Sequence, residues 1–355
     1  MKKLSVCVLF GGMSPEHEVS LRSAESVLNH MDKEKYNIFP VGITKEGDWV
    51  LFAGEDYSML PAGTWQEFPG NRRATISPVR GQGLLSFEGD CVVRERIDVV
   101  FPVLHGENGE DGAMQGLLNL AGIPYVGPHV AASAVAMDKT LTKLVLDEAG
   151  IPQAAWQLVR TGDLESRMDR IVEQLEEKFQ YPMFVKPAGT GSSVGVSKAA
   201  DREKLKAALQ FAGKYDVKIL VEEFIDGQEI EVAVMGNGNP VASECGEIDS
   251  GAEFYDYDAK YITDTSTAYI PARIDPEVGE RVRELAVKAY KAIGCEGLSR
   301  VDFFVTHGDH RPVFNEINTI PGFTSISMYP KLFDYSGIPY TQLIDELLAL
   351  AVEAG

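Results

Sequence analysis

The chain has 355 residues, of which 45% are hydrophobic and 24% charged, and its formal net charge is −20. These proportions are typical of an ordinary soluble globular protein, and the length allows two or three domains. The negative charge argues against nucleic acid and against a membrane as partners, because anionic phosphates attract clustered Lys and Arg. An anionic substrate therefore needs local cations that overcome the overall field.

The cysteines predict a reducing compartment. Cys7, Cys91, Cys245 and Cys295 are far apart and form no C-x-x-C pair. We expect reduced thiols in the core and a cytoplasmic protein. The first residues superficially resemble a signal peptide, but their apolar run is short, ends in glycines and lacks an A-x-A site. We therefore expect a buried first strand, and no segment as long as a membrane span.

The first third of the chain alternates apolar strands with helical stretches, which is typical of a parallel βαβ unit. Strands are expected at 4–10, 36–43 and 97–106, and helices at about 19–31 and 111–121. Asp111 is the candidate cap of the second helix. The segment I-P-Y-V-G closes the unit, and the Gly- and Pro-rich residues 44–93 are expected to form short hairpins or an insertion.

After about residue 128 the pattern changes to that of a small α+β module. Its helices are expected at 129–136, 138–149, 164–178 and 200–212, and its strands near 155–160, 182–187 and 194–198. Further strands follow, with a polar and aromatic loop at 249–268, a helix at 276–293, a strand hairpin and a closing helix near 340–353. We predict three domains, which cover residues 1–127, 128–221 and 222–355.

The strand hairpin carries the strongest chemical signal. The apolar runs V-D-F-F-V and P-V-F-N-E-I bring Asp302, Glu316 and Asn318 to neighbouring points. Oxygen ligands on paired strands suit Mg²⁺, which often bridges phosphates. Arg300 precedes them and a Pro-Gly turn with Gly322 follows. A fixed guanidinium stabilises a transferring phosphoryl group or an oxyanion, so the hairpin predicts phosphate chemistry.

Two glycine-rich turns follow strands of the first third, where ligands bind in open α/β sheets. The turn G-G-M-S-P-E-H-E-V-S lacks the dinucleotide fingerprint and the P-loop. Its Glu16 either holds a substrate ammonium or stabilises the helix dipole, and the motif alone leaves both open. The loop H-G-E-N-G-E-D-G places His105 at a strand end, where it orients a substrate carboxylate or phosphate, or carries a proton.

The segment M-F-V-K-P-A-G-T-G-S-S-V-G-V predicts a phosphate site, because it leads Lys186 into a loop with Ser192 whose backbone N–H groups can surround an anion. Lys139, in M-D-K-T, heads a helix. Glu222 and Glu229 lie on consecutive strands and suit an amino-purine edge and ribose hydroxyls, although solvated acidic edges are common. The tyrosine-rich loop 254–261 is either a lid or an interface patch.

Together these segments resemble the D-alanine–D-alanine ligases of the ATP-grasp superfamily. The resemblance covers almost the whole chain apart from residues 44–93. Its motifs, in order, are H-G-E-N-G-E-D-G, M-D-K-T, V-K-P-A-G-T-G-S-S-V-G, Y-D-Y-D-A-K-Y, S-R-V-D and N-E-I-N-T-I-P-G-F-T-S. It implies a three-domain ATP-grasp architecture, α/β and α+β, with an N-terminal Rossmann-like parallel-sheet domain.

The resemblance also implies a reaction in which ATP phosphorylates one D-alanine and the amine of a second D-alanine displaces phosphate. Its product serves peptidoglycan synthesis, and the family suggests a homodimer. The implied nucleotide contacts are Lys139, Lys186, Glu222 and Glu229, and the implied ligands of two Mg²⁺ ions, or of Mn²⁺, are Asp302, Glu316 and Asn318. The implied contacts to the D-alanines and the oxyanion are Glu16, His105, Ser192, Lys260, Tyr261, Arg300, Gly322, Ser327 and Met328.

Four alternative functions are considered. A different ATP-grasp ligase is disfavoured, because Glu16, His105 and Tyr261 would then have no assigned substrate. D-serine as the second substrate is the nearest, and the apolar side chain of Met328 favours the methyl of D-alanine, since a buried hydroxyl needs a partner. A D-lactate ligase is disfavoured because Tyr261 is retained. A nucleotide-binding regulator without turnover needs no metal-ligand set beside an oxyanion donor.

Overall fold

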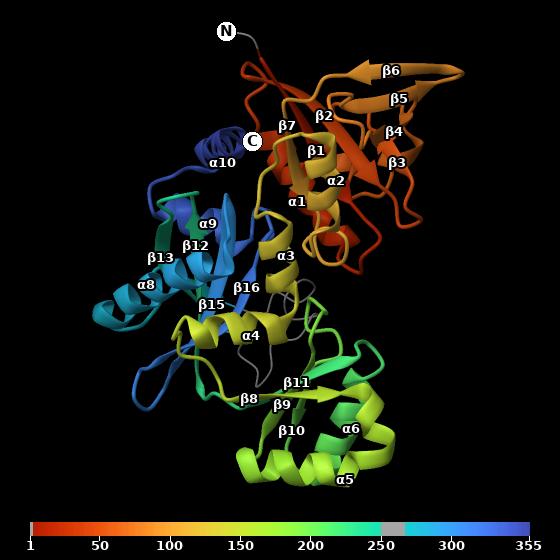
Figure 1. The fold of residues 1–355 in the computed structure, drawn as a ribbon. Helices are drawn as coiled ribbons and strands as arrows, with labels where there is room; N and C mark the ends of the chain where they lie inside the picture. Colours follow the sequence, from red (N-terminus) through yellow and green to blue (C-terminus); the bar gives the residue numbers. More distant parts are fainter. Residues whose placement is uncertain (1–2, 250–266) are drawn as a thin grey trace.

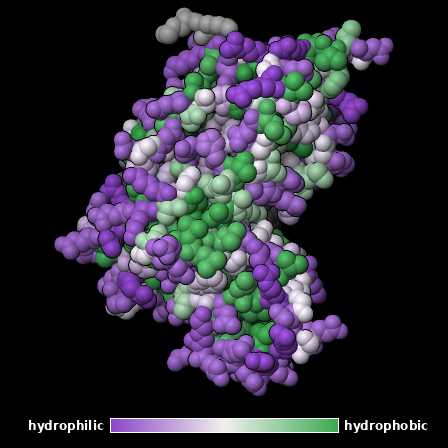
Figure 2. All heavy atoms as spheres, in the orientation of Figure 1, coloured by the Kyte–Doolittle hydropathy of each residue, from purple (hydrophilic) through white to green (hydrophobic). Residues whose placement is uncertain are grey.

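The structure is a computed structural model and describes residues 3–249 and 267–355. The described residues form three sheets, and Figure 1 shows the N-terminal sheet at the top, the C-terminal sheet in the middle and the small central sheet at the bottom. Hydrophobic residues gather around the waist of the face shown in Figure 2, whereas the two ends are mainly hydrophilic. None of the helices in the described part of the chain is long and apolar enough to cross a membrane.

The N-terminal sheet has a parallel core. Strand β1 (Leu4–Gly11) lies between β2 (Tyr36–Ile43) and β7 (Val99–Val103), and both pairs are parallel, as the continuous apolar runs predict. Residues 44–93, expected to form short hairpins or an insertion, extend this sheet with consecutive antiparallel strands and two 3₁₀ turns. These elements are β3 (Trp49–Leu51), η1 (Tyr57–Met59), η2 (Trp65–Glu67), β4 (Arg72–Ile76), β5 (Leu84–Glu88) and β6 (Cys91–Glu95).

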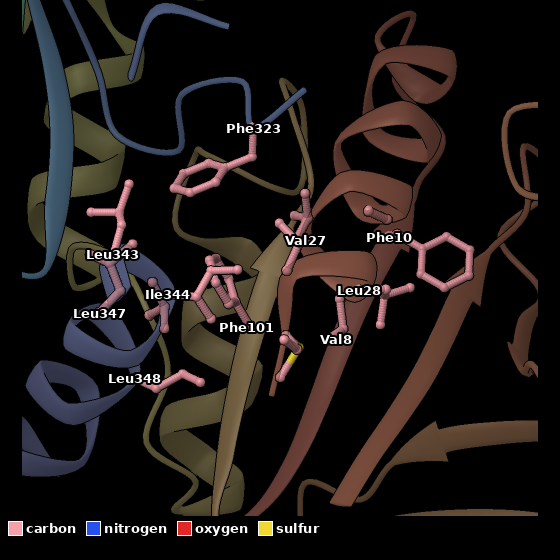
Figure 3. Close-up of a cluster of buried hydrophobic side chains, with 14 of the residues drawn as sticks. Val8, Phe10, Val27, Leu28, Phe101, Phe323, Leu343, Ile344, Leu347 and Leu348 are labelled. Carbon is pink, nitrogen blue, oxygen red and sulfur yellow. The ribbon is translucent and has the colours of Figure 1, made fainter. Parts of the chain in front are cut away.

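Two helices begin close to where the sequence predicts them. Helix α1 (His17–His30) packs on the sheet, and Figure 3 shows its Val27 and Leu28 beside Phe101 of β7 and the residues of a C-terminal helix. Helix α2 (Ala113–Ala121) starts after Gly112 rather than at Asp111. Gly112 takes the N-cap position with a φ of 99°, while Asp111 accepts a hydrogen bond from the backbone N–H of Ala113 at 2.9 Å.

The central sheet is antiparallel in the order β10-β9-β11-β8. Its strands are β8 (Trp156–Arg160), β9 (Met183–Pro187), β10 (Ser197–Ala199) and β11 (Lys218–Glu223). The amphipathic helices α5 (Thr161–Lys178) and α6 (Arg202–Ala212) share one hydrophobic core with it. Apart from β11, for which no bounds were predicted, these elements lie where the sequence predicts them, to within three residues.

The C-terminal sheet has the order β14-β13-β12-β15-β16. Its strands are β12 (Gly227–Met235), β13 (Val241–Asp249), β14 (Thr267–Tyr269), β15 (Leu298–Thr306) and β16 (Pro312–Asn318). The helices around it are α3 (Val130–Met137), α4 (Lys139–Glu148), α8 (Pro276–Ile293), α9 (Met328–Tyr335) and α10 (Tyr340–Ala354). Alternate residues of β12 face two different cores, one with α8 and the other with α9 and α10.

The predicted division into domains stays a prediction, although the packing gives two relevant facts. Helices α3 and α4 precede the central sheet in sequence but share the hydrophobic core of α8 and the C-terminal sheet. Strand β11 belongs to the central sheet and ends at Glu223, two residues beyond the predicted boundary.

The expectation of buried thiols is confirmed for three cysteines and wrong for the fourth. Cys7, Cys245 and Cys295 are free and buried. Cys91 is exposed, because it begins the edge strand β6 of the N-terminal sheet.

Candidate active site

A cavity of about 1960 Å³ lies where the three sheets meet. Nearly all of the predicted residues within the described part of the chain line it. They are Glu16, His105, Lys139, Lys186, Ser192, Glu222, Glu229, Arg300, Glu316, Asn318, Gly322, Ser327 and Met328. Asp302 lies beneath this surface and is 1% exposed, and the predicted lid residues Lys260 and Tyr261 lie outside the described residues.

Glu16 projects into the cavity between two glycine loops. It occupies the N-cap position of α1, but its side chain makes no capping hydrogen bond. Its Oε1 instead accepts a hydrogen bond from Ser192 Oγ at 2.5 Å. A Cβ on Gly106 would lie 1.9 Å from Glu16 Oε2, and one on Gly191 would lie 3.0 Å from Oε1. This packing favours the ligand-holding interpretation of Glu16 over a role at the helix terminus.

The loop after β9 has an unusual backbone. Ser192 and Ser193 both have positive φ angles, 48° and 58°, in a backbone region that residues other than glycine rarely adopt. Such conformations cost about 1–3 kcal/mol each and gather at functional sites. Lys139 Nζ donates to the carbonyl of Thr190 in the same loop at 2.5 Å. The predicted phosphate loop is thus tied both to Glu16 and to one of the predicted phosphate lysines.

Glu222 is a buried carboxylate that binds two lysines. Lys186 Nζ lies 2.7 Å from Glu222 Oε2, and Lys143 Nζ forms an ion pair with Oε1. Burial raises the pKa of Glu222, but the two cations lower it by more than burial raises it, and the pKa is about 2. Lys186 lies within an apolar run, where burial without a nearby anion would be costly. Strand pairing supplies that anion, because β9 and β11 are adjacent in the central sheet.

The predicted metal ligands lie in two rows across the C-terminal sheet. Pairing places Asp302 opposite Glu231 on one side and Glu316 on the other, so three carboxylates share one row. Arg300 and Asn318 lie opposite each other in the next row. A β-bulge follows Asp302 in this hairpin, and bulges often redirect side chains beside active sites.

Arg300 is largely buried, with 17% of its side chain exposed, and is ion-paired with carboxylates. Its Nε and Nη2 donate to the two oxygens of Asp302 at 2.8 and 2.7 Å, and its Nε lies 3.2 Å from Glu231 Oε2. Burial lowers the pKa of Arg300, but Asp302 and Glu231 raise it well above its usual value. The guanidinium is therefore permanently charged and fixed in direction, as a stabiliser of an oxyanion must be.

The side-chain oxygens of Asp302, Glu316 and Asn318 suit a hard divalent cation. Among the described residues no group of three or more His, Cys, Asp and Glu is arranged to hold a metal, and the predicted set instead combines two acids with an amide. Asn318 Nδ2 donates to Asp302 Oδ2 at 3.0 Å. Oxygen ligands of this kind suit Mg²⁺ or Mn²⁺.

The residues predicted to face the second substrate gather at the start of α9. A Cβ on Gly322 would lie 2.9 Å from Ser327 Oγ, so the two are adjacent. Ser327 Oγ also accepts a hydrogen bond from the backbone N–H of Thr324 at 3.0 Å. Met328 lines the cavity but is largely buried, and its Cε packs against Gly246.

His105 makes its hydrogen bonds within the protein. Its Nδ1 lies 3.0 Å from the carbonyl oxygen of Ile320, and its Nε2 lies 3.1 Å from Ser23 Oγ. Burial lowers the pKa of His105 to about 4, although the bond to Ile320 opposes this effect. The ring is therefore neutral at pH 7 and poorly suited to the proton-carrying role that the sequence left open.

Three titratable residues at or near the cavity were missed in the sequence. Lys143 and Glu231 have just been described, and Glu110 accepts hydrogen bonds from Gly106 N–H at 2.6 Å and Ile320 N–H at 3.2 Å. Burial and the nearby Glu16 raise the pKa of Glu110 to about 8. Helical and strand spacing contained a signal for two of them. Lys143 is four residues after Lys139, and Glu231 is two residues after Glu229.

Comparison with known families gives a consistent result for both parts of the chain. Residues 5–128 match the family described as "D-ala D-ala ligase N-terminus", and residues 145–349 match "D-ala D-ala ligase C-terminus". The chain belongs to the D-alanine–D-alanine ligase family. Among its relatives, the D-alanine–D-alanine ligase of Caldicellulosiruptor bescii is 51% identical, with 99% of this chain and 96% of that protein covered. The corresponding ligase of Acetivibrio thermocellus is 50% identical with the same coverage.

Solved structures of this ligase family share the fold over its full length. The VanG D-Ala:D-Ser ligase from Enterococcus faecalis is 39% identical, with a TM-score of 0.89 over 99% of this chain and 100% of that one. The D-alanine–D-alanine ligase from Coxiella burnetii is 37% identical, with a TM-score of 0.85 over 100% and 95%. The predicted fold class, α/β and α+β of the ATP-grasp type with a Rossmann-like N-terminal parallel sheet, is therefore confirmed, and antiparallel strands extend the parallel core of that sheet.

Proposed function

We propose that the protein joins two D-alanine molecules at the expense of ATP. One observation carries this proposal. A single cavity contains a carboxylate suited to an ammonium group, lysines suited to phosphates, and an arginine and a backbone turn suited to an oxyanion. Membership of the D-alanine–D-alanine ligase family, with relatives of about 50% identity along the chain, supports the same substrates.

In the proposed first step, Glu16 holds the ammonium group of the first D-alanine. A carboxylate oxygen of that substrate attacks the γ-phosphorus of ATP, and the bond between this phosphorus and the ADP oxygen breaks. Lys139 and Lys186 bind the phosphates, while Glu222 and Glu229 bind adenine and ribose. Lys186 must exchange part of its ion pair with Glu222 for a phosphate when ATP enters.

In the second step, the amine of the second D-alanine attacks the acyl carbon of D-alanyl phosphate. The tetrahedral intermediate then expels phosphate, and the amine loses a proton. Arg300 and the N–H of Gly322 stabilise the oxyanion of this intermediate. Ser327, with Lys260, binds the second carboxylate, and Ser192 with Tyr261 connects the glycine loop and the lid to Glu16.

Divalent cations complete the proposed site. Asp302, Glu316 and Asn318 would hold two Mg²⁺, or Mn²⁺ in their place. When bound, these ions neutralise charge on the transferring phosphoryl group. The dipeptide product would serve peptidoglycan synthesis. Because the reaction consumes intracellular ATP, we propose that the enzyme acts in the cytoplasm, and we expect a homodimer, which light scattering coupled to gel filtration tests.

D-serine as the second substrate is the alternative that a specific observation supports, namely the likeness to a D-Ala:D-Ser ligase structure. Against it stands Met328 on the cavity wall, which offers no partner for an additional hydroxyl.

The experiment that separates an enzyme from a nucleotide-binding regulator is phosphate release by wild type and by Glu316→Gln with ATP, Mg²⁺ and D-alanine. We expect wild type to turn over and the variant to lose at least a hundredfold in kcat, about 3 kcal/mol of transition-state stabilisation. Wild type that binds ATP but releases no phosphate would contradict the proposal.

A further inference from the structure

The backbone on both sides of Gly322 is held by side chains of the N-terminal unit. On one side, the Ile320 N–H donates to Glu110 Oε1 at 3.2 Å, and the Ile320 carbonyl oxygen lies 3.0 Å from His105 Nδ1. On the other side, the Phe323 N–H donates to Ser23 Oγ at 3.2 Å. Gly322, whose N–H is the proposed oxyanion donor, lies between these fixed points.

These contacts form one consistent hydrogen-bond chain. Because Ser23 Oγ accepts from Phe323, its own proton is available to His105 Nε2, which lies 3.1 Å away. This assignment places the ring proton of the neutral histidine on Nδ1, which then donates to the Ile320 carbonyl. Every polar atom in the chain of contacts has the correct donor or acceptor role, and both Ser23 and His105 are buried.

The held segment has no secondary structure of its own. Residues 319–327 belong to no helix or strand. A peptide N–H stabilises an oxyanion strongly only if its direction is fixed before the reaction, since reorientation then costs nothing. Within a helix or strand, the ladder of hydrogen bonds fixes that direction. Here side chains from a different part of the chain must do so.

We propose that Ser23, His105 and Glu110, the backbone clamp, are positioning residues that aim the Gly322 N–H at the position where the oxyanion forms. This proposal rests on the proposed ligase function. The clamp also extends to Glu16, because Glu110 Oε2 accepts from the N–H of Gly106, against which the Glu16 carboxylate packs. It therefore sets the spacing between the group that holds the ammonium of the first D-alanine and the group that faces its carbonyl.

The test compares two buried serines that have the same backbone-capping role. Ser23→Ala removes the acceptor of the Phe323 N–H, and Ser23 does not line the cavity. The matched control is Ser243→Ala, because Ser243 Oγ is also buried and accepts the backbone N–H of Ala233 at 3.0 Å, away from the cavity. Both variants lose a hydroxyl and leave one buried N–H without its acceptor.

We expect Ser23→Ala to lower kcat for dipeptide formation by at least about tenfold, because small misplacements of catalytic groups cost one to two orders of magnitude. The KM for ATP should change less than twofold, and Ser243→Ala should keep the kcat of wild type. Exchange of bridging and non-bridging oxygens in labelled ATP, which reports D-alanyl phosphate formation alone, should persist in Ser23→Ala. This split between half-reactions is something a general loss of stability would not produce.

Three results would overturn the proposal. The first is a kcat of Ser23→Ala equal to that of Ser243→Ala, which would show that Ser23 has no positioning role. The second is an equal fall in the rates of oxygen exchange and of dipeptide formation in Ser23→Ala, which would show that the second step is not affected specifically. Wild type that makes no dipeptide overturns the ligase function and this assignment together. If Ser23→Ala does not fold, Glu110→Gln is measured in the same way, because a glutamine accepts only one of the two backbone N–H groups and should give the same split.

Discussion

The ion-paired carboxylate of Glu222 allows a quantitative prediction. Its pKa is held at about 2 instead of the usual 4.5, in spite of a burial that raises it. At about 1.4 kcal/mol per pKa unit, the paired carboxylate contributes about 3 kcal/mol to the free energy of unfolding. Because the folded pKa is the lower one, this contribution is present above pH 4.5 and is lost as the pH falls through about 2.

The perturbation is Lys143→Met, which keeps the length and apolar stem of this buried side chain and removes its charge. Lys186 remains beside Glu222, so part of this contribution should be kept and the free energy of unfolding at pH 7 should fall by roughly 1–2 kcal/mol. With one cation gone, Glu222 should also hold Lys186 more tightly, and the KM for ATP should rise. Urea denaturation gives the first quantity, and steady-state kinetics gives the second.

A double-mutant cycle tests the reasoning directly. In a Glu222→Gln background, Lys143→Met should lose no stability, because the charge it would leave without its partner is absent. An equal loss in both backgrounds would refute the ion-pair account and leave only packing. Lys206→Met is the control, since its exposed pair with Asp169 should contribute little to stability.

Four further outcomes follow from the site. Gly106→Ala should reduce dipeptide formation about a hundredfold in a folded protein, as judged by circular dichroism, because its Cβ would displace Glu16. Glu16→Gln should raise the KM for the first D-alanine at least about tenfold and leave the KM for ATP unchanged, as steady-state kinetics can show. Because the pKa of Glu110 is raised to about 8, its proton favours the folded state below pH 4.5, and this advantage disappears as the pH rises through 8. In thermal denaturation, the stability of wild type relative to Glu110→Gln should therefore fall between pH 5 and 9. Chelation of divalent cations should stop phosphate release, and added Mg²⁺ should restore it.

Local patterns in the sequence were sufficient for most elements of the fold. The continuous apolar run of β1, the exact span of α8 and the ligand-bearing hairpin β15–β16 were predicted from periodicity and turn residues alone. The pairing of the short strands between residues 49 and 95 with the N-terminal sheet was not, because strands of three to five residues separated by Gly- and Pro-rich loops acquire their partners from tertiary neighbours. Helix α9 was missed as well.

The site shows the same limit more sharply. Motifs identified Glu16, Lys186 and Arg300, because each lies beside a glycine turn or within a strand. They did not reveal Lys143 or Glu110, since a buried charge is explained only by the partner that strand pairing or loop packing brings to it from elsewhere in the chain. The contact between His105 and Ile320 spans 215 residues and had no local signal.

The measurement that tests the central claim most directly is the mass of the product formed from ATP, Mg²⁺ and a panel of D-alanine, D-serine, D-lactate and L-alanine. The account predicts ADP, phosphate and D-alanyl-D-alanine from D-alanine alone. It also predicts that D-alanine remains the preferred second substrate when D-serine is present. If D-Ala-D-Ser forms in preference to D-alanyl-D-alanine, the reaction mechanism stands but the role assigned to Met328 is contradicted. Binding of ATP without any condensed product would contradict the ligase function itself.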